Sequence, residues 1–290
     1  MTTLGELLRS TERRLAQAGV EEARLEAELL LMTALSADRA TLYANLQDPA
    51  THERAGALEA LMLRRVKREP TAYITGKREF YGREFHVGPG VFIPRPETET
   101  LVEEALRIAA TIGGGLTIAD IGCGSGAIGI TLVAELPRAV AYAIDIDAAA
   151  LQAARKNVER LATPNRVKVL RGDLLAPLPA PVDIIAANPP YIPSKQIPGL
   201  PPEVKSYEPR RALDGGLDGM DLLRRLLTDA PRYLKPGGAL LAEIDPEQAT
   251  EARALAHAAF PGAAVDVARD LAGRERVLTV RTGAASPASG

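Results

Sequence analysis

The fold of this chain is decided by one stretch, Leu116–Ala127, with the sequence LTIADIGCGSGA. The apolar start of the stretch, 116–119, predicts a buried strand, and the apolar series 128–136 after the glycines predicts a helix that Pro137 ends. Glycines between a strand and a helix let the backbone turn tightly and let a ligand approach the helix N-terminus. The stretch therefore predicts a cofactor loop in an α/β domain.

Helical and strand patterns alternate on both sides of this loop. Such alternation predicts a doubly wound α/β domain, which we expect to cover residues 96–282, and the small polar residues 283–290 are expected to form a disordered tail. The expected helices are 96–110, 126–136, 147–161, 218–233 and 246–259, and the expected strands are 116–121, 139–144, 166–171, 181–187, 238–244, 264–268 and 275–281.

Residues 1–70 are expected to form a small all-α domain. A first leucine-rich helix ends at Gly19, a second apolar series starts at Leu25, and Thr51 can cap a third helix. A basic run near the end of the third helix is interpreted as a solvated helix end rather than a surface for a partner, because cations stabilise a helix C-terminus. This run consists of Arg64, Arg65, Lys67 and Arg68.

Residues 71–95 differ from both neighbours and are expected to form a β-hairpin linker. Glycines, prolines and aromatic residues accumulate there, and apolar and polar residues alternate briefly at 85–87 and 91–93.

Composition excludes several classes of function. The longest stretch without a charge, 121–134, has 14 residues with four glycines, so we expect no transmembrane helix and no membrane partner. The N-terminus lacks the pattern of a secretory signal, and a cytoplasmic protein is expected. One cysteine and three histidines cannot build a disulfide framework or a multi-Cys/His zinc site, and no metal is expected. The net charge of −2 gives no general attraction to nucleic acid.

Asp120 separates two possible cofactors of the glycine loop. The loop also satisfies the dinucleotide pattern G-x-G-x-x-A, so a nicotinamide oxidoreductase is one alternative. A carboxylate two residues ahead of Gly122 would repel a pyrophosphate but attract ammonium and sulfonium groups. S-adenosylmethionine (SAM) carries both of these groups and no phosphate. Asp145, at the end of the next expected strand, can accept hydrogen bonds from the ribose hydroxyls of either cofactor.

Three further residues near the loop have simpler interpretations or peripheral roles. Asp147 is expected to cap the helix that follows it. Cys123 is expected to be a small loop residue rather than a nucleophile, because no histidine lies near it in sequence. Leu174, just past the third strand, is placed to reach the adenine.

The tetrapeptide Asn188–Tyr191, NPPY, follows the fourth expected strand directly. Substrates of α/β domains bind beside the carboxyl ends of strands. The prolines lack an N–H, so the carbonyls around them are free to accept hydrogen bonds. The side-chain carbonyl of Asn188 and the carbonyl of Pro189 could accept both hydrogens of an NH₂ group and orient its lone pair at an incoming methyl group. Tyr191 could stack on a planar amide or base. The simpler interpretation is a rigid turn.

Together these segments resemble the PrmC/HemK family of release-factor glutamine methyltransferases. The family pattern runs through GKREFYG at 76–82, IPRPETE at 93–99, DIGCGSG at 120–126 and NPPY at 188–191, and it spans about residues 1–282. The resemblance implies a class I SAM-dependent methyltransferase fold, which is Rossmann-like and has a seven-stranded, mostly parallel sheet. A helical substrate-recognition domain and a β-hairpin linker precede this domain in the sequence. It also implies that the substrate is the glutamine of the Gly-Gly-Gln loop in class-1 peptide chain release factors.

The resemblance assigns roles to the site residues. Asn188 is expected beside both the cofactor and the substrate. The methionine part of SAM is assigned to Gly122, Cys123, Gly124, Ser125 and Gly126, with Asp120 nearby, the ribose to Asp145 and the adenine to Leu174. The substrate amide is assigned to Asn188, Pro189, Pro190 and Tyr191, of which Asn188, Pro189 and Tyr191 are the expected catalytic residues.

Alternatives remain at this stage. A DNA or RNA amino-methyltransferase would suit the same tetrapeptide, but residues 1–70 hold ten basic and eleven acidic side chains, a poor partner for phosphates, so no direct nucleic-acid partner is expected. An oxidoreductase and a non-enzymatic binding module are the other two. Arg95, Glu97 and Glu99 can serve either the site or a helix start. The segment 245–248, DPEQ, departs from the family pattern and is expected to cap a helix instead.

Overall fold

The computed structural model describes residues 2–161 and 165–283 and divides the chain into two compact units. Of the described residues, those up to 77 together with 201–207 form the first unit, and those from 78 to 200 and from 208 onward form the second. A hairpin is present between the two expected domains, with β1 at Lys77–Phe80 and β2 at Arg83–His86, but the alternation at 91–93 forms no strand. The expected disordered tail lies outside the described residues, apart from Gly283.

The first unit is helical. Its core consists of apolar side chains from the long helices, and the hydroxyl of Thr51 caps one of them by accepting from the Arg54 N–H, as expected. The sequence did not indicate three helices of this unit: α3 precedes the capped helix, α5 lies at the start of the expected hairpin linker, and α9 comes from a segment inserted from the second unit's part of the chain. The helices are α1 (Leu4–Gln17), α2 (Ala23–Leu35), α3 (Arg39–Ala44), α4 (His52–Val66) and α5 (Thr71–Thr75), with α9 (Pro202–Tyr207) from the inserted segment.

The interpretation of the basic run at the end of α4 as a solvated helix end is wrong for Arg65, whereas Arg64 and Lys67 are exposed as expected. Arg65 is only 4% exposed, and its guanidinium donates to the carboxylates of Glu26 and Glu203. Arg68 pairs with the same Glu203 carboxylate at 2.7 Å, and Arg64 pairs with Glu69 at 2.5 Å. Since Glu203 belongs to α9, these ion pairs hold a distant segment of the chain on α4, and a buried charge of this kind requires such partners.

The second unit contains a seven-stranded sheet in the order β5-β4-β3-β6-β7-β9-β8. The strands from β5 to β7 run parallel to one another, and β9 is antiparallel to both of its neighbours, β7 and β8. The expected mostly parallel sheet is thus confirmed. The strands are β3 (Thr117–Ile121), β4 (Val140–Asp145), β5 (Val167–Arg171), β6 (Val182–Ala187), β7 (Leu234–Glu243), β8 (Ala264–Arg269) and β9 (Glu275–Arg281).

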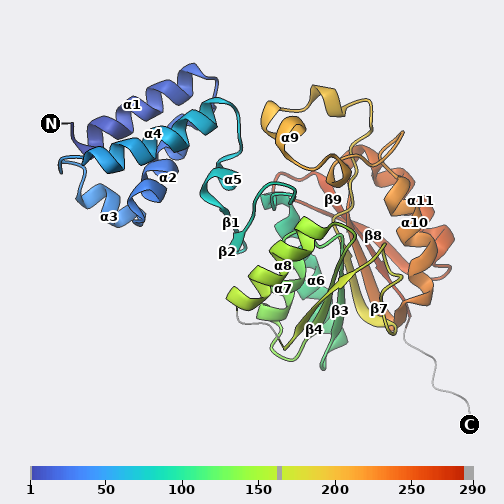
Figure 1. Cartoon of the computed structure of the whole chain (residues 1–290). Coiled ribbons are helices and arrows are strands. Elements are labelled where there is room, and N and C mark those ends of the chain that lie inside the picture. Colours follow the sequence, from blue (N-terminus) through green and yellow to red (C-terminus); the bar gives the residue numbers. More distant parts are fainter. Residues whose placement is uncertain (1, 162–164, 284–290) are drawn as a thin grey trace, which may run out of the picture. The chain divides into compact units, whose positions relative to one another are not determined.

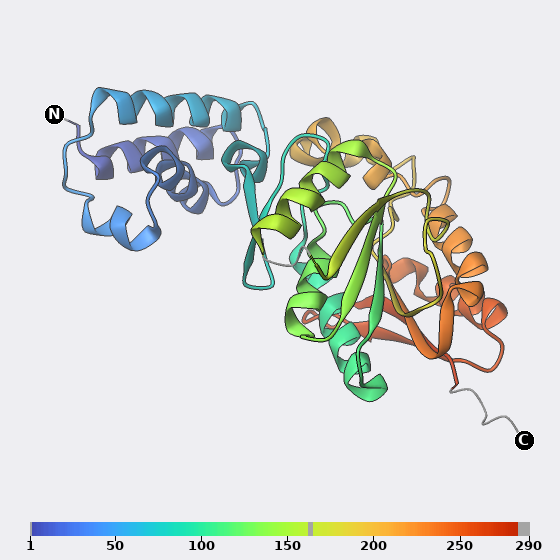
Figure 2. The ribbon, with the colours of Figure 1, turned by 60° about the horizontal axis from the view of Figure 1, so that its bottom comes forward.

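Helices cover both faces of this sheet, and in both views α7 and α8 lie across the sheet from α10 and α11 (Figures 1 and 2). Neighbouring strand residues such as Ile118 and Ala119 therefore enter different apolar cores. Burial on both faces explains why the central strands β3, β4 and β6 are mostly apolar along their length. The helices are α6 (Glu99–Ile112), α7 (Ala127–Glu135), α8 (Ala148–Arg160), α10 (Asp221–Asp229) and α11 (Ala249–Ala259). Within the described ranges, no helix has the length and apolar character needed to cross a membrane.

The order of the strands creates one special place in the sheet. The chain moves from β3 outward to β4 and β5, and then returns to pair β6 with the other edge of β3. The loops that follow β3 and β6 therefore leave the sheet in opposite directions, which opens a crevice at the carboxyl ends of these strands. The glycine loop and residues 188–191 both begin there.

Candidate active site

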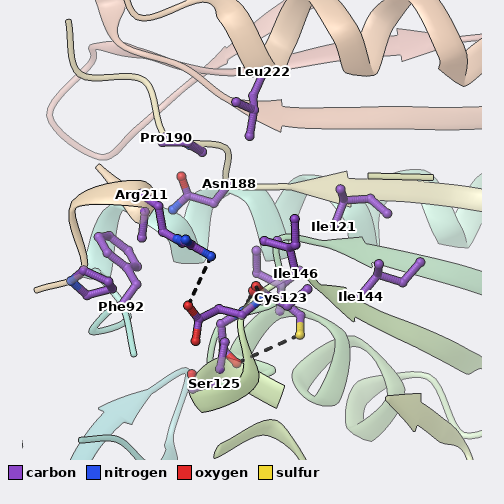
Figure 3. A pocket seen from close by; sticks show the side chains of 18 of the residues that line it. Phe92, Ile121, Cys123, Ser125, Ile144, Ile146, Asn188, Pro190, Arg211 and Leu222 are labelled. Carbon is purple, nitrogen blue, oxygen red and sulfur yellow. Dashed lines mark hydrogen bonds and ion pairs between the residues drawn. The ribbon is translucent and has the colours of Figure 1, made fainter. Parts of the chain in front are cut away.

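A pocket lies at this crevice, and it brings together most of the residues that the sequence indicated. Figure 3 shows Asn188 and Pro190 on one side of the pocket and Cys123 and Ser125 of the glycine loop on the other. Eight predicted site residues line it: Gly122, Cys123, Gly124, Ser125, Asp145, Leu174, Asn188 and Pro190. Four do not: Asp120, Gly126, Pro189 and Tyr191.

The glycine loop exposes bare backbone to the pocket. Gly122 and Gly124 have φ angles of +67° and +54°, which residues with a side chain rarely adopt. A Cβ on either glycine would meet no atom within 4 Å. Gly126 differs, because a Cβ there would lie 2.9 Å from the Ile130 side chain, so it serves the packing of the loop against α7. Cys123 is 6% exposed, and burial raises the pKa of its thiol well above the usual value. An inert thiol agrees with the expectation that Cys123 is not a nucleophile.

Asp120 lies beneath the loop rather than in the pocket. Its Oδ2 accepts the Gly129 N–H at 2.8 Å, and its Oδ1 is buried and has no hydrogen-bond partner among the described residues. Burial raises the pKa of Asp120 to about 7. The carboxylate therefore fixes the first turn of α7, and a positive charge in the pocket above it would favour its ionised form.

The ionisation of Asp120 has a measurable consequence for stability. An acid whose pKa is raised on folding holds a proton in the folded state that the unfolded state has already lost, so the free energy of unfolding falls as the pH rises. For Asp120 this window lies between the ordinary pKa of 3.8 and about 7. We expect the melting temperature of the SAM-free protein to fall more between about pH 5 and about pH 8 than that of Asp120→Asn, measured by scanning calorimetry. An equal fall in the two proteins would contradict this assignment.

Asp145 and Asp147 share a loop but have different tasks. Both carboxylate oxygens of Asp145 accept backbone N–H groups at 2.9 Å, Oδ2 from Gly124 and Oδ1 from Asp147, and each keeps a lone pair. Burial raises the pKa of the Asp145 carboxyl. Asp147 caps α8, as expected, because its Oδ1 accepts the Ala149 N–H at 2.8 Å. Its Oδ2 also pairs with Arg211 at 3.4 Å, and both residues line the pocket.

Leu174 reaches the pocket through an uncommon backbone conformation. Its φ angle is +48°, in the left-handed region that few residues other than glycine adopt, and the residue is 9% exposed. Such strain persists only where the surrounding structure holds it, and it is concentrated at binding sites.

The tetrapeptide after β6 is held from behind. The Nδ2 of Asn188 donates to the hydroxyl of Thr98 at 3.0 Å, and the Tyr191 hydroxyl donates to Glu243 at 3.1 Å. The Nε2 of Gln248 donates to the Tyr191 carbonyl at 3.0 Å. Within the described part of the chain, no group donates to the Asn188 side-chain oxygen or to the Pro189 carbonyl. The Asn188 oxygen, on a residue that lines the pocket, and the carbonyl of the next residue in the chain therefore both remain available as acceptors.

Comparison with known proteins agrees with this geometry. The model of the PrmC N-terminal domain matches residues 6–76, and that of the methyltransferase small domain matches residues 98–198. The release factor glutamine methyltransferase of Geobacter sulfurreducens is 45% identical over 85% of this chain and 86% of that protein. The corresponding protein of Moorella thermoacetica is 46% identical over 94% of this chain and 96% of that protein. The chain belongs to the release factor glutamine methyltransferase family.

This membership confirms the family that the sequence motifs indicated. The oxidoreductase and binding-module alternatives are wrong, and the methyl donor of this methyltransferase is SAM. A 16S rRNA methyltransferase from T. thermophilus, solved in complex with AdoMet and guanosine, shares the fold, with a TM-score of 0.52 and 22% identity over 71% of this chain and 49% of that one.

The pocket of the methyltransferase fits this donor. The Ser125 hydroxyl is buried without a hydrogen-bond partner among the described residues, and it belongs to a residue that lines the pocket. Gly122 and Gly124 leave their backbone open to close approach. Asp145 offers the spare lone pairs that hydroxyls require. The site thus combines an acceptor carboxylate, an unpaired hydroxyl and side-chain-free backbone.

The segment Ile93–Glu99 of the methyltransferase reaches the site through a residue that sequence reasoning did not single out. Arg95 pairs with the buried Glu208 and lies 4.8 Å from the ring of Phe92, and Glu99 accepts the Tyr81 N–H at 2.9 Å. These charged residues hold the surrounding loops. Thr98 is the member that both lines the pocket and contacts Asn188. Its place within the family motif is the signal in the sequence that points to Thr98.

The departure at 245–248 forms the expected cap. The Asp245 carboxylate accepts the Glu247 N–H at 2.9 Å, and the Gln248 side chain accepts the Asp245 N–H at 3.1 Å. The other end of the Gln248 amide binds the Tyr191 carbonyl. The segment that departs from the family pattern in this methyltransferase therefore also supports the tetrapeptide.

Proposed function

We propose that this methyltransferase transfers the methyl group of SAM to the side-chain amide nitrogen of the glutamine in the Gly-Gly-Gln loop of class-1 peptide chain release factors. The observation that carries the proposal is the pair of free acceptors, Asn188 Oδ1 and the Pro189 carbonyl, beside a pocket that fits SAM. Two acceptors match the two hydrogens of a primary amide.

An amide nitrogen is a weak nucleophile, and the chain supplies orientation rather than a strong base. SAM, when bound, supplies an electrophilic methyl group on a sulfonium. Asn188 and Pro189 would hold both N–H bonds of the glutamine amide, so that its lone pair faces the methyl group, and would stabilise the positive charge that develops on the nitrogen. Pro190 lines the same pocket and would limit the access of water to it.

Other site residues would hold the donor. Asp145 would accept the ribose hydroxyls, and the glycine loop with Ser125 would contact the methionine part. Leu174 would contact the adenine. Asp120 would act through its charge from beneath the loop, since it does not line the pocket.

The role of Tyr191 changes from the one expected. Its hydroxyl is bound to Glu243 and it does not line the pocket, so we assign it to the support of the tetrapeptide rather than to stacking on the substrate. The helical first unit, which matches the PrmC N-terminal domain over residues 6–76, is the part that we assign to release-factor recognition. Since release factors act in translation, we place the reaction in the cytoplasm.

Mass spectrometry of a purified class-1 release factor, incubated with SAM and this protein, tests the proposal. We expect one added methyl group on the glutamine of the Gly-Gly-Gln loop and none with Asn188→Ala. SAM binding without transfer to the release factor would contradict the substrate assignment. An exocyclic amine of DNA or RNA, which the same tetrapeptide would suit, is the substrate to test in that case.

A further inference from the structure

Glu243 is a buried carboxylate that the proposed reaction does not use directly. It lies at the end of β7 and is 1% exposed. Two hydroxyl groups donate to it, that of Thr98 to Oε2 at 2.6 Å and that of Tyr191 to Oε1 at 3.1 Å. Burial of a carboxylate is costly, so a position at a sheet end that needed only packing would be filled better by an apolar side chain.

Both donors lead to the NPPY tetrapeptide. Tyr191 is its last residue, and Thr98 accepts a hydrogen bond from the Nδ2 of Asn188, its first residue, at 3.0 Å. One carboxylate therefore holds the two ends of a segment whose middle consists of two prolines. Burial raises the pKa of Glu243, and the charge of Glu97 beside Thr98 adds to this rise. The hydrogen bonds from Thr98 and Tyr191 and the positive charge of Arg276 on β9 favour the ionised form.

The direction of these hydrogen bonds follows from the number of protons available. A threonine hydroxyl has one proton, and that of Thr98 donates its hydrogen bond to Glu243. The Thr98 oxygen can then offer only lone pairs to Asn188. The side chain of Asn188 must turn its NH₂ toward Thr98, which leaves its carbonyl oxygen on the opposite side of the amide group. If the Thr98 hydroxyl donated to Asn188 and not to Glu243, it would favour the opposite orientation of the Asn188 amide, with the side-chain oxygen facing Thr98.

We propose that Glu243 and Thr98 are positioning residues that fix the side-chain amide of Asn188 with its oxygen toward the substrate. This inference rests on the proposed function, because it explains why Asn188 presents an acceptor to the glutamine NH₂. Glu243 sets the direction of the Thr98 hydroxyl, Thr98 sets the direction of the Asn188 amide, and the free Oδ1 is the result.

A glutamine in place of Glu243 could not accept hydrogen bonds from both Thr98 and Tyr191, as the carboxylate does. An amide of the same shape has one acceptor and one donor, so it can accept from Thr98 or from Tyr191 but not from both. If its NH₂ faces Thr98, the Thr98 hydroxyl turns to Asn188 and the Asn188 amide reverses. If its NH₂ faces Tyr191, it donates to the Tyr191 hydroxyl, whose own proton then loses its acceptor. Either outcome disturbs one end of the tetrapeptide.

The test compares Thr98→Val, Thr98→Ser and Glu243→Gln in release-factor methylation, with SAM affinity measured by calorimetry. We expect Thr98→Val and Glu243→Gln to lower kcat about tenfold, the effect of one lost hydrogen bond, while SAM affinity stays within about twofold. Thr98→Ser keeps the hydroxyl and is expected to recover most of kcat. Thr279→Val is the matched control, because it removes the hydroxyl of another threonine that is only 5% exposed, on β9. An unchanged kcat in Thr98→Val, or an equal loss in Thr98→Ser, would overturn the proposal.

A second measurement keeps this inference separate from the choice of substrate. The chain has four asparagines, Asn45, Asn157, Asn165 and Asn188, so the side-chain amide of Asn188 can be assigned by NMR after selective ¹⁵N labelling. We expect its NH₂ protons to exchange slowly with solvent in the parent protein and in Thr98→Ser, and faster in Thr98→Val. Equal exchange in all three would overturn the inference. An inactive parent protein with protected Asn188 protons would count against the proposed substrate alone.

Discussion

Replacement of Asn188 by alanine is expected to lower kcat for glutamine methylation at least about 100-fold, because a preorganised group that acts on charge developing in the transition state contributes an effect of this size. The substitution removes the side-chain oxygen that would hold one N–H of the glutamine, and it leaves the Pro189 carbonyl as the only acceptor of the pair. SAM affinity is expected to change less than about threefold, since the interaction matters mainly at the reacting nitrogen. Steady-state kinetics with a release factor and calorimetry with SAM measure the two quantities.

The same variant has an internal control in its SAM affinity. Asn188 also lines the pocket, so a disturbed loop would weaken SAM binding along with kcat. Equal losses in kcat and in SAM affinity would therefore show that Asn188 supports the pocket. They would contradict the assignment of Asn188 as an acceptor for the glutamine NH₂. A loss confined to kcat separates chemistry from cofactor binding.

The sequence predicted those parts of the fold that depend on local patterns. The strand, glycine loop and helix around Gly122 follow from spacing and apolar character alone, and the strand ends that carry Asp145 and Asn188 were placed correctly. Helix ends were less certain. The expected helix 218–233 consists of α10 at Asp221–Asp229 followed by one 3-10 turn at Ala230–Arg232.

The support of the site could not be predicted, because its contacts join distant parts of the chain. Thr98 reaches Asn188 across 90 positions and Glu243 across 145. Gln248 reaches Tyr191 across 57 positions. No periodicity connects such residues, so each was a plausible surface or core residue in the sequence.

The positions of two charged residues were predicted wrongly, because their burial also depends on contacts between distant parts of the chain. Asp120 was expected to act on the cofactor from the loop, but the loop covers it and its carboxylate holds the Gly129 N–H. Arg65 was expected to be solvated, but Glu26 and Glu203 enclose its guanidinium. Charge is visible in a sequence, whereas the depth at which the fold buries it is a tertiary property.

Asp145→Ala is expected to weaken SAM binding about 100-fold. Hydrogen bonds to a charged acceptor contribute about 1.5–3 kcal/mol each, so two ribose hydroxyls bound by the Asp145 carboxylate account for about 3 kcal/mol or more. Adenosine alone, which shares the ribose, should lose a similar factor. Calorimetry with SAM and with adenosine gives both values.

The matched control is Asp147→Ala, which also removes a carboxylate from the pocket lining. This substitution chiefly removes the cap of α8, at a cost of about 1 kcal/mol in stability. Its SAM affinity should stay within about threefold of the parent value. An unchanged affinity in Asp145→Ala would move the ribose contact to another residue, and an equal loss in both variants would assign the effect to the loop they share.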